Sequence, residues 1–237
     1  MSAFSSLPVR RIERDTAAVL DEREWFAQIP AVRQLLDDGL EPGPLTIFTG
    51  ENGSGKSTVV EAIAAVYGLN PEGGTHNAMH RSQLTESPLH EHLRVVRSMG
   101  SSRRGVFLRG ETMFDHLGYL ESINSPGVLN HQSHGESLIE YFSSRSAISG
   151  LWVLDEPEAG LSFSSCFSLI LHLKNLIAEG SQVILSTHSP VLASMPGADH
   201  YEFGEHGMRR VDYDDLDMVQ NWRLFLDAPE RFLRHLE

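Results

Sequence analysis

A glycine-rich stretch that ends in a lysine and a serine carries the clearest chemistry in the sequence. Residues 50–57 read GENGSGKS. Glycines in such a loop let backbone N–H groups turn toward phosphate oxygens, and a following helix adds the positive end of its dipole. The ammonium of Lys56 can reach the β- and γ-phosphates, and the hydroxyl of Ser57 can coordinate Mg²⁺. The pattern predicts a site for a nucleoside triphosphate and Mg²⁺.

The residues on either side predict the strand and the helix that such a loop requires. Residues 45–49 are short and apolar, as in a buried strand. Apolar residues then recur at helical spacing at Val59, Val60, Ile63, Ala64 and Tyr67. Gly68 suits the end of that helix. In this setting of strand, loop and helix, we predict that nine consecutive residues bind the nucleotide: Gly50, Glu51, Asn52, Gly53, Ser54, Gly55, Lys56, Ser57 and Thr58.

Two carboxylates follow a second apolar run. Residues 151–154 read LWVL and are followed by Asp155 and Glu156. The carboxyl end of a parallel strand is where open α/β sheets bind their ligands. We predict that Asp155 holds Mg²⁺ together with Ser57, and that Glu156 polarises an attacking water as the catalytic base.

A histidine follows a third apolar run. Residues 183–185 are apolar, and residues 186–190 read STHSP. His188 would lie at the same sheet edge as Gly50 and Asp155, where it could hydrogen-bond a γ-phosphate or the attacking water. We predict that His188 and Lys56 share the catalytic work with Glu156.

A fourth stretch, LNHQSHGESLIEYF at residues 129–142, places Ser133 and Glu136 three residues apart. This spacing is typical of a capping box, in which each side chain bonds the other residue's backbone N–H at the start of a helix. Leu138, Ile139 and Phe142 then give that helix one apolar face. The local pattern therefore predicts a helix N-terminus.

The bulk composition is that of a globular α/β protein. The chain has 237 residues, with 41% hydrophobic and 22% charged residues, which is enough for one large domain. Its net charge of −13 argues against a chain that is basic throughout and wraps nucleic acid. One cysteine, Cys166, excludes an internal disulfide framework and fits the cytoplasm. We see no signal peptide and no apolar run near the roughly 20 residues of a membrane span.

The order of these four motifs resembles the ATP-binding-cassette (ABC) ATPase superfamily across almost the whole chain. The likeness is greatest to small AAA-type bacterial ATPases with an SHGES signature, which are related to DNA-repair and chromosome-maintenance ATPases. The resemblance implies hydrolysis of ATP to ADP and phosphate. It also implies that Ser133, through its hydroxyl, and Gly135, through its N–H, bind the γ-phosphate of ATP held by a second subunit. Two ATP molecules would then be sandwiched in a homodimer.

The expected fold is an α/β P-loop NTPase of the ABC-ATPase type. The resemblance implies a mostly parallel sheet flanked by helices, a small antiparallel edge subdomain and a helical lobe. We predict one domain over residues 1–237, in which residues 71–146 form a variable loop and the lobe that carries the signature. A C-terminal hairpin should turn at GEHG, residues 204–207, before helices that Pro229 interrupts. We expect five apolar side chains of these helices to pack on the core: Leu224, Phe225, Phe232, Leu233 and Leu236.

The chain departs from the superfamily pattern at several positions. His134 replaces a glycine of the signature, and Ser162 stands where many members have an aspartate. Glu111 takes the place of the glutamine that usually follows the third strand. Trp25 and Phe26 are candidates for stacking on adenine, although we favour a role in the core for both.

The stretch at residues 71–104 is a basic island in an acidic protein. It is rich in glycine, serine and histidine, and its arginines are Arg81, Arg94, Arg97, Arg103 and Arg104. We favour a solvated loop, with a surface for nucleic acid or an acidic partner as the alternative. Three functions therefore stay open: an ATPase dimer, an ATP-gated switch that acts on DNA or a protein, and the ATP-binding subunit of a membrane transporter.

Overall fold

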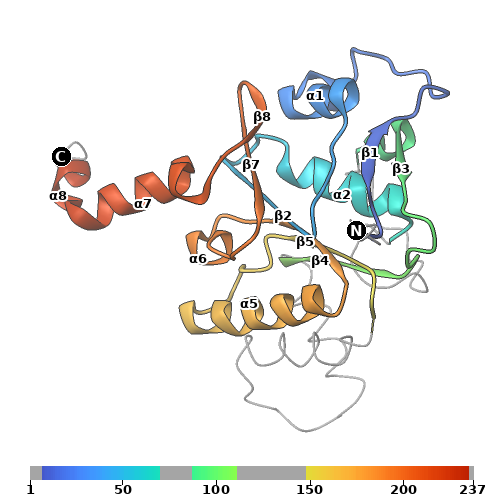
Figure 1. Ribbon diagram of the computed structural model, residues 1–237. Coiled ribbons are helices and arrows are strands. Elements are labelled where there is room, and N and C mark those ends of the chain that lie inside the picture. The colour runs from blue at the N-terminus through green and yellow to red at the C-terminus, as the bar shows by residue number, and fades with distance from the viewer. Residues whose placement is uncertain (1–6, 70–86, 111–147, 235–237) are drawn as a thin grey trace, which may run out of the picture.

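The computed structural model describes residues 7–69, 87–110 and 148–234, which form a mixed α/β fold (Figure 1). Its main sheet has six strands in the order β4-β5-β6-β2-β7-β8. In chain order these strands are β2 Leu45–Gly50, β4 Gly105–Arg109, β5 Leu151–Asp155, β6 Gln182–Ser186, β7 Asp199–Gly204 and β8 Gly207–Arg210. All neighbouring pairs are parallel except β7 and β8, which form the hairpin predicted at GEHG. The mostly parallel sheet confirms the expected fold class.

Helices cover both faces of this sheet, as Figure 1 shows. The helices are α1 Pro30–Asp38, α2 Lys56–Tyr67, α5 Phe163–Ala178, α6 Pro190–Ala193, α7 Asp217–Asp227 and α8 Pro229–Leu233. Short 3-10 turns are η1 Trp25–Gln28, η2 Pro88–His92 and η3 Tyr213–Asp215. Within the described residues, none of the helices is long and apolar enough to cross a membrane.

The strands are apolar on both sides because each face of the sheet is buried. Phe48 and Val153 point into the core formed with α1 and α2. Their neighbours Ile47 and Leu154 point into the core formed with α5. This alternation, with a period of two residues, follows from strand geometry. The resulting three layers hold the carboxyl ends of β2, β5 and β6 side by side, because β6 pairs with both other strands.

A second, two-stranded antiparallel sheet matches the expected edge subdomain. It pairs β1 Arg11–Arg14 with β3 Leu93–Val96. Ile12, Leu89 and Leu93 bury their side chains in the same core as α2. The side-chain amide of Gln182, at the start of β6, links the N-terminal segment to the main sheet. It donates to the carbonyls of Val9, Pro42 and Gly43 at 3.0–3.1 Å.

The basic island differs from the loop that we expected. Within it, residues 88–96 form η2 and β3, which pack on the core. Arg94 pairs with Glu13 at 2.6 Å, and Arg97 donates to the carbonyl of Tyr67 at 3.0 Å and covers its ring. The arginines at these two positions are engaged within the chain, which weakens the case for a nucleic-acid surface here.

The two C-terminal helices were predicted correctly, but the burial of their apolar side chains was not. Figure 1 shows α7 and α8 extending away from the sheet. Leu224, Phe232 and Leu233 are exposed, by 53%, 43% and 51%, and Phe225 is half-buried. Leu236 lies outside the described residues. The amphipathic pattern predicted the helices and their apolar faces, but it did not show what those faces would pack against.

Candidate functional site

The predicted phosphate loop lies between β2 and α2. Lys56 is the first residue of α2, and its ammonium turns back into the loop. It donates to the carbonyls of Gly50 and Glu51, each at 2.9 Å. Burial lowers the pKa of Lys56, while the nearby carboxylates of Glu156, Asp155 and Glu158 oppose that shift. A buried ammonium that donates to two carbonyls of the loop is well placed to bind an anion there.

The backbone of the loop needs its glycines. Gly50 and Gly55 have φ angles of 131° and 98°, a region that side chains with a Cβ rarely adopt. A Cβ at Gly50 would lie 2.3 Å from the carbonyl oxygen of Phe203, and one at Gly55 would lie 2.6 Å from Ile29. The loop is therefore confined by β7 on one side and by the start of α1 on the other.

Asp155 ends β5 at the centre of the site. Its Oδ1 accepts a hydrogen bond from the hydroxyl of Ser57 at 3.2 Å and another from Ser186. The guanidinium Nε of Arg109 lies 3.8 Å from its other oxygen. Burial raises the pKa of Asp155, although the bonds from Ser186 and Ser57 and the charge of Arg109 act in the opposite direction. Ser57 and Asp155, the two predicted Mg²⁺ ligands, thus lie in contact.

Glu156 adopts a strained backbone conformation. Its φ of 48° is the only positive value at a non-glycine position in the part of the chain that the structure describes. Such a conformation costs on the order of 1 kcal/mol. The backbone N–H of Glu156 donates to the carbonyl of Ser186 at 3.1 Å, which holds the turn against β6. In this conformation the partly exposed carboxylate lies beside the residues that follow β6.

His188 occupies that strand end and faces Glu156. The imidazole Nε2 lies 3.2 Å from Oε1 of Glu156, but this nitrogen makes no hydrogen bond to any of the described residues. Both side chains are about one-third exposed, by 37% and 35%. The structure therefore brings together Lys56, Ser57, Asp155, Glu156 and His188, all of which were predicted for this edge.

Glu158 is a residue that the sequence reasoning missed. Its Oε1 accepts hydrogen bonds from the hydroxyl of Thr187 and from the N–H groups of His188 and Ser189. Two carboxylates separated by one proline, at positions 156 and 158, were the available signal. Their partners could not be inferred without knowing that β5 and β6 are neighbours.

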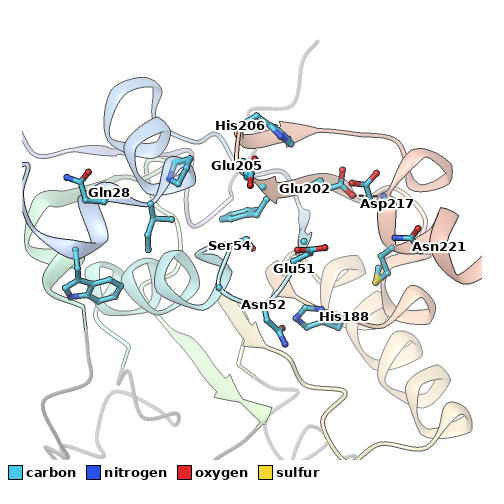
Figure 2. A pocket seen from close by; sticks show the side chains of 18 residues that line it. Gln28, Glu51, Asn52, Ser54, His188, Glu202, Glu205, His206, Asp217 and Asn221 are labelled. Carbon is cyan, nitrogen blue, oxygen red and sulfur yellow. Dashed lines mark hydrogen bonds between the residues drawn. The ribbon is translucent and has the colours of Figure 1, made fainter. Parts of the chain in front are cut away.

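The phosphate loop opens into a cavity of about 840 Å³, a volume suited to a small-molecule ligand. Glu51, Asn52, Gly53, Ser54 and His188 are among the residues that line it. Figure 2 shows Gln28 on one side and Glu202, Asp217 and Asn221 on another. Thr58 lies beyond this cavity lining, half-buried in the first turn of α2.

The two aromatic candidates for adenine stacking have different surroundings. Phe26 is fully buried and stacks on His92, as expected for a core residue. Trp25 is 55% exposed and lines the cavity, so our expectation of a core role was wrong for this residue. Ser162, one of the departures from the superfamily pattern, accepts a hydrogen bond from the N–H of Ser165 and caps α5.

The predicted signature stretch and Glu111 cannot be placed. Outside the described residues lie Glu111, Ser133, His134, Gly135, Glu136, Leu138, Ile139 and Phe142. Within the described ranges, no group of three or more histidine, cysteine, aspartate or glutamate side chains could hold a metal ion. A metal in the site would therefore depend on one carboxylate, a hydroxyl and oxygens of the nucleotide and water.

Comparisons with known proteins agree with this geometry. Residues 35–98 match the family model of an AAA domain, and residues 141–194 match one described as "AAA domain, putative AbiEii toxin, Type IV TA system". The cytochrome c biogenesis ATP-binding export protein CcmA of Rhizobium johnstonii is 27% identical over 64% of this chain and 79% of its own length.

Two further matches differ in extent. The ribose import ATP-binding protein RbsA of Roseobacter denitrificans is 25% identical over 69% of this chain, which spans only 36% of that protein. Among solved structures, the SMC head domain from Thermotoga maritima aligns with a TM-score of 0.46 and 14% identity, over 73% of this chain and 93% of that one. The phosphate loop and the carboxylates at the end of β5, together with the AAA-domain models and the ATP-binding relatives, support a P-loop ATPase of the ATP-binding-cassette superfamily.

Proposed function

We propose that this chain hydrolyses ATP in a Mg²⁺-dependent cycle, as a homodimer that holds two ATP molecules between its subunits. The observation that carries the proposal is the meeting of three strand ends. β2 leads to Lys56 and Ser57, β5 ends in Asp155 followed by Glu156, and β6 leads to His188. A phosphate-binding cation, an oxygen pair for a metal and a carboxylate for water thus share one sheet edge.

The first task of the site is to hold the phosphates. The ammonium of Lys56 already lies within the loop at Gly50 and Glu51, so a bound triphosphate would replace carbonyl oxygens with phosphate oxygens as its partners. Backbone N–H groups at the start of α2 would add donors and the helix dipole. A triphosphate held in this way would have its γ-phosphate near the ends of β5 and β6.

The second task is to bind Mg²⁺, and the residues present fit that ion. The Ser57 and Asp155 side-chain oxygens lie 3.2 Å apart, and oxygen ligands of this kind suit a small hard cation. Burial raises the pKa of Asp155, so a cation at this position would offset a costly buried charge. When bound, Mg²⁺ neutralises charge that develops on the β- and γ-phosphates.

The third task is to activate water. Glu156 is partly exposed at the open side of the site, and its carboxylate would accept a proton from a water in line with the γ-phosphate. His188, 3.2 Å from that carboxylate, would hold the water or the γ-phosphate from the other side. The cavity beyond the loop would take the base and ribose, with Trp25 as the stacking surface.

The homodimer rests on the signature motif. A capped helix N-terminus with a serine hydroxyl and a glycine N–H is suited to bind phosphate. In the proposed dimer, Ser133 and Gly135 of each subunit contact the γ-phosphate held by the other subunit.

Light scattering on the Glu156→Gln variant tests both parts of the proposal. This variant should bind Mg²⁺-ATP without turnover, and its mass should double from the 26.4 kDa of one chain. Adding Ser133→Arg should abolish the doubling while ATP binding persists. A Glu156→Gln protein that hydrolyses ATP at the wild-type rate would contradict the assignment of the base. A mass that stays at one chain with ATP bound would contradict the homodimer.

The relatives favour a second candidate, the ATP-binding subunit of a transporter. Three of them are named as export or import ATP-binding proteins. In that case the chain would act with a membrane-embedded partner. The test is co-purification from detergent-solubilised membranes in the presence of ATP. An integral membrane protein that co-purifies with the wild-type chain but not with the Lys56→Ala variant would support this candidate over the free homodimer.

A further inference from the structure

The turn that follows β5 contacts His188 at two different points. Glu156 faces the imidazole, whereas Glu158 binds the backbone. Oε1 of Glu158 lies 2.6 Å from the N–H of His188, 3.1 Å from the N–H of Ser189 and 2.7 Å from the hydroxyl of Thr187. One carboxylate oxygen therefore collects three donors from the segment that carries the histidine.

These hydrogen bonds offset the cost of burying the carboxylate of Glu158. Oε2 of Glu158 is buried, and among the described residues it has no hydrogen-bond partner. Burial raises the pKa of Glu158, and the hydrogen bonds from Thr187 and His188 oppose the shift. A buried carboxylate that lacks a cation partner is costly unless donors satisfy it.

Further hydrogen bonds restrict the segment that carries His188. The N–H of Ser189 also approaches the hydroxyl of Thr187 at 2.9 Å, and the hydroxyl of Ser189 caps α6 by accepting from Leu192. On the other side, Leu161 donates to the carbonyl of Glu158 at 2.8 Å, which closes the turn after β5. The side chain of Glu158 thus joins the turn after β5 to the turn after β6.

We propose that Glu158 is a positioning residue of this site, which holds His188 opposite Glu156 and thereby sets the rate of the chemical step. The proposal rests on the ATPase function proposed above. Loss of the carboxylate would release the backbone of His188 and leave its imidazole free to move away from the γ-phosphate. Misplacement of a catalytic group by about 1 Å can cost on the order of a hundredfold in rate.

Two variants separate positioning from charge. Glu158→Gln keeps an oxygen that can accept from the same three donors, so its kcat should stay within about threefold of wild type. Glu158→Ala removes the acceptor, so kcat should fall by about tenfold to a hundredfold while the affinity for ATP changes by less than about threefold. Glu179→Ala, on the exposed end of α5, is the matched control for loss of an acidic side chain.

A double-mutant cycle with His188 shows whether Glu158 acts through the histidine. In a His188→Ala background, Glu158→Ala should lower kcat by less than about twofold further, because the group that it positions is already absent. An equal loss in both backgrounds would overturn the proposal, and so would an unchanged kcat in Glu158→Ala alone.

Amide hydrogen exchange tests the same contact without relying on turnover. The N–H groups of His188 and Ser189 should exchange faster in Glu158→Ala than in wild type, and near the wild-type rate in Glu158→Gln. Unchanged exchange in Glu158→Ala would overturn the proposal even if ATP is hydrolysed. If wild type hydrolyses no ATP but exchange responds as expected, the proposed function fails while the anchoring of His188 stands.

Discussion

The carboxyl edge of the main sheet and the C-terminal helices α7 and α8 place their side chains in opposite ways. At the sheet edge, charged groups are buried, with Lys56 only 4% exposed and Asp155 only 3%. On α7, the apolar Trp222 and Leu226 are exposed by 47% and 68%. Each region thus breaks the ordinary rule that apolar groups lie inside and charges outside.

The difference lies in what compensates each exception. Lys56 and Asp155 have hydrogen-bond partners from β2, α2 and β6, so their positions are determined by the fold. Trp222 packs edge-on against Phe225, which is on the same helix. Buried polar groups thus mark a site that the sheet itself organises, whereas an exposed apolar face contributes little to the fold of the described chain.

The sharpest test of the sheet edge is Glu156→Gln. Because the amide cannot accept a proton from water, kcat should fall by about 10²–10⁴-fold while ATP still binds. Steady-state hydrolysis and equilibrium binding of ATP measure the two quantities. Wild-type turnover in this variant would mean that Glu156 is not the catalytic base.

A pair of leucine substitutions tests the contrast in packing. Leu173→Ala on α5 removes a fully buried side chain and should lower the free energy of unfolding by about 2–5 kcal/mol. Leu226→Ala on α7 should change it by less than about 0.5 kcal/mol, because the side chain is 68% exposed. Urea unfolding of both variants gives the comparison. A large loss for Leu226→Ala would show that α7 is covered in solution.

Trp25 tests whether an exposed apolar residue can belong to the site. It is 55% exposed, as the side chains of α7 are, but it lines the cavity beside the phosphate loop. If its ring stacks on the base, Trp25→Ala should weaken ATP binding by about tenfold. Titration with ATP and with inorganic triphosphate is the measurement. An equal loss for both ligands would contradict stacking, because triphosphate has no base.

Asp155 gives the smallest expected effect and the one with a defined pH dependence. Burial raises the pKa of its carboxyl, so the folded state binds this proton more tightly than the unfolded chain does. The charged form therefore costs stability above the folded pKa, and the cost disappears as the pH falls toward the ordinary value of 3.8. Without nucleotide, Asp155→Asn should be more stable than wild type at neutral pH, by a margin that shrinks in acid.

Thermal unfolding with Mg²⁺-ATP provides the control for that experiment. Wild type should gain stability from the ligand, whereas Asp155→Asn should gain less because it has lost a charged ligand for the cation. A variant that gains as much as wild type would argue against Asp155 as a Mg²⁺ ligand.

The sequence predicted those parts of the molecule whose signals are local. The stretch from β2 through the loop to α2 was predicted because residues 45–68 contain a strand, glycines at fixed positions and a helical period. Asp155, Glu156 and His188 were placed at one edge because each follows a short apolar run, and parallel strands end on the same side.

The parts that were missed depend on contacts between distant segments. Glu158 bonds to residues about 30 positions away, through the neighbouring strand. Strand β3 was missed because it lies in a basic stretch that we interpreted as a loop, and its partner β1 lies some 80 residues earlier. The exposure of Leu224 and Leu233 could not be foreseen, since helical periodicity defines a face without saying what covers it.

The order of strands in the main sheet has a consequence for how the chain is made. Strand β2 ends at Gly50, but the strands that flank it, β6 and β7, end at Ser186 and Gly204. At about 5–20 residues per second, a ribosome needs roughly 8 to 30 seconds more to supply both neighbours. The phosphate loop is therefore synthesised early, and during that interval β2 lacks the two neighbouring strands that hold the loop in place. A nascent chain therefore acquires its nucleotide site late, and a chain cut before residue 204 would carry the motif without the pocket.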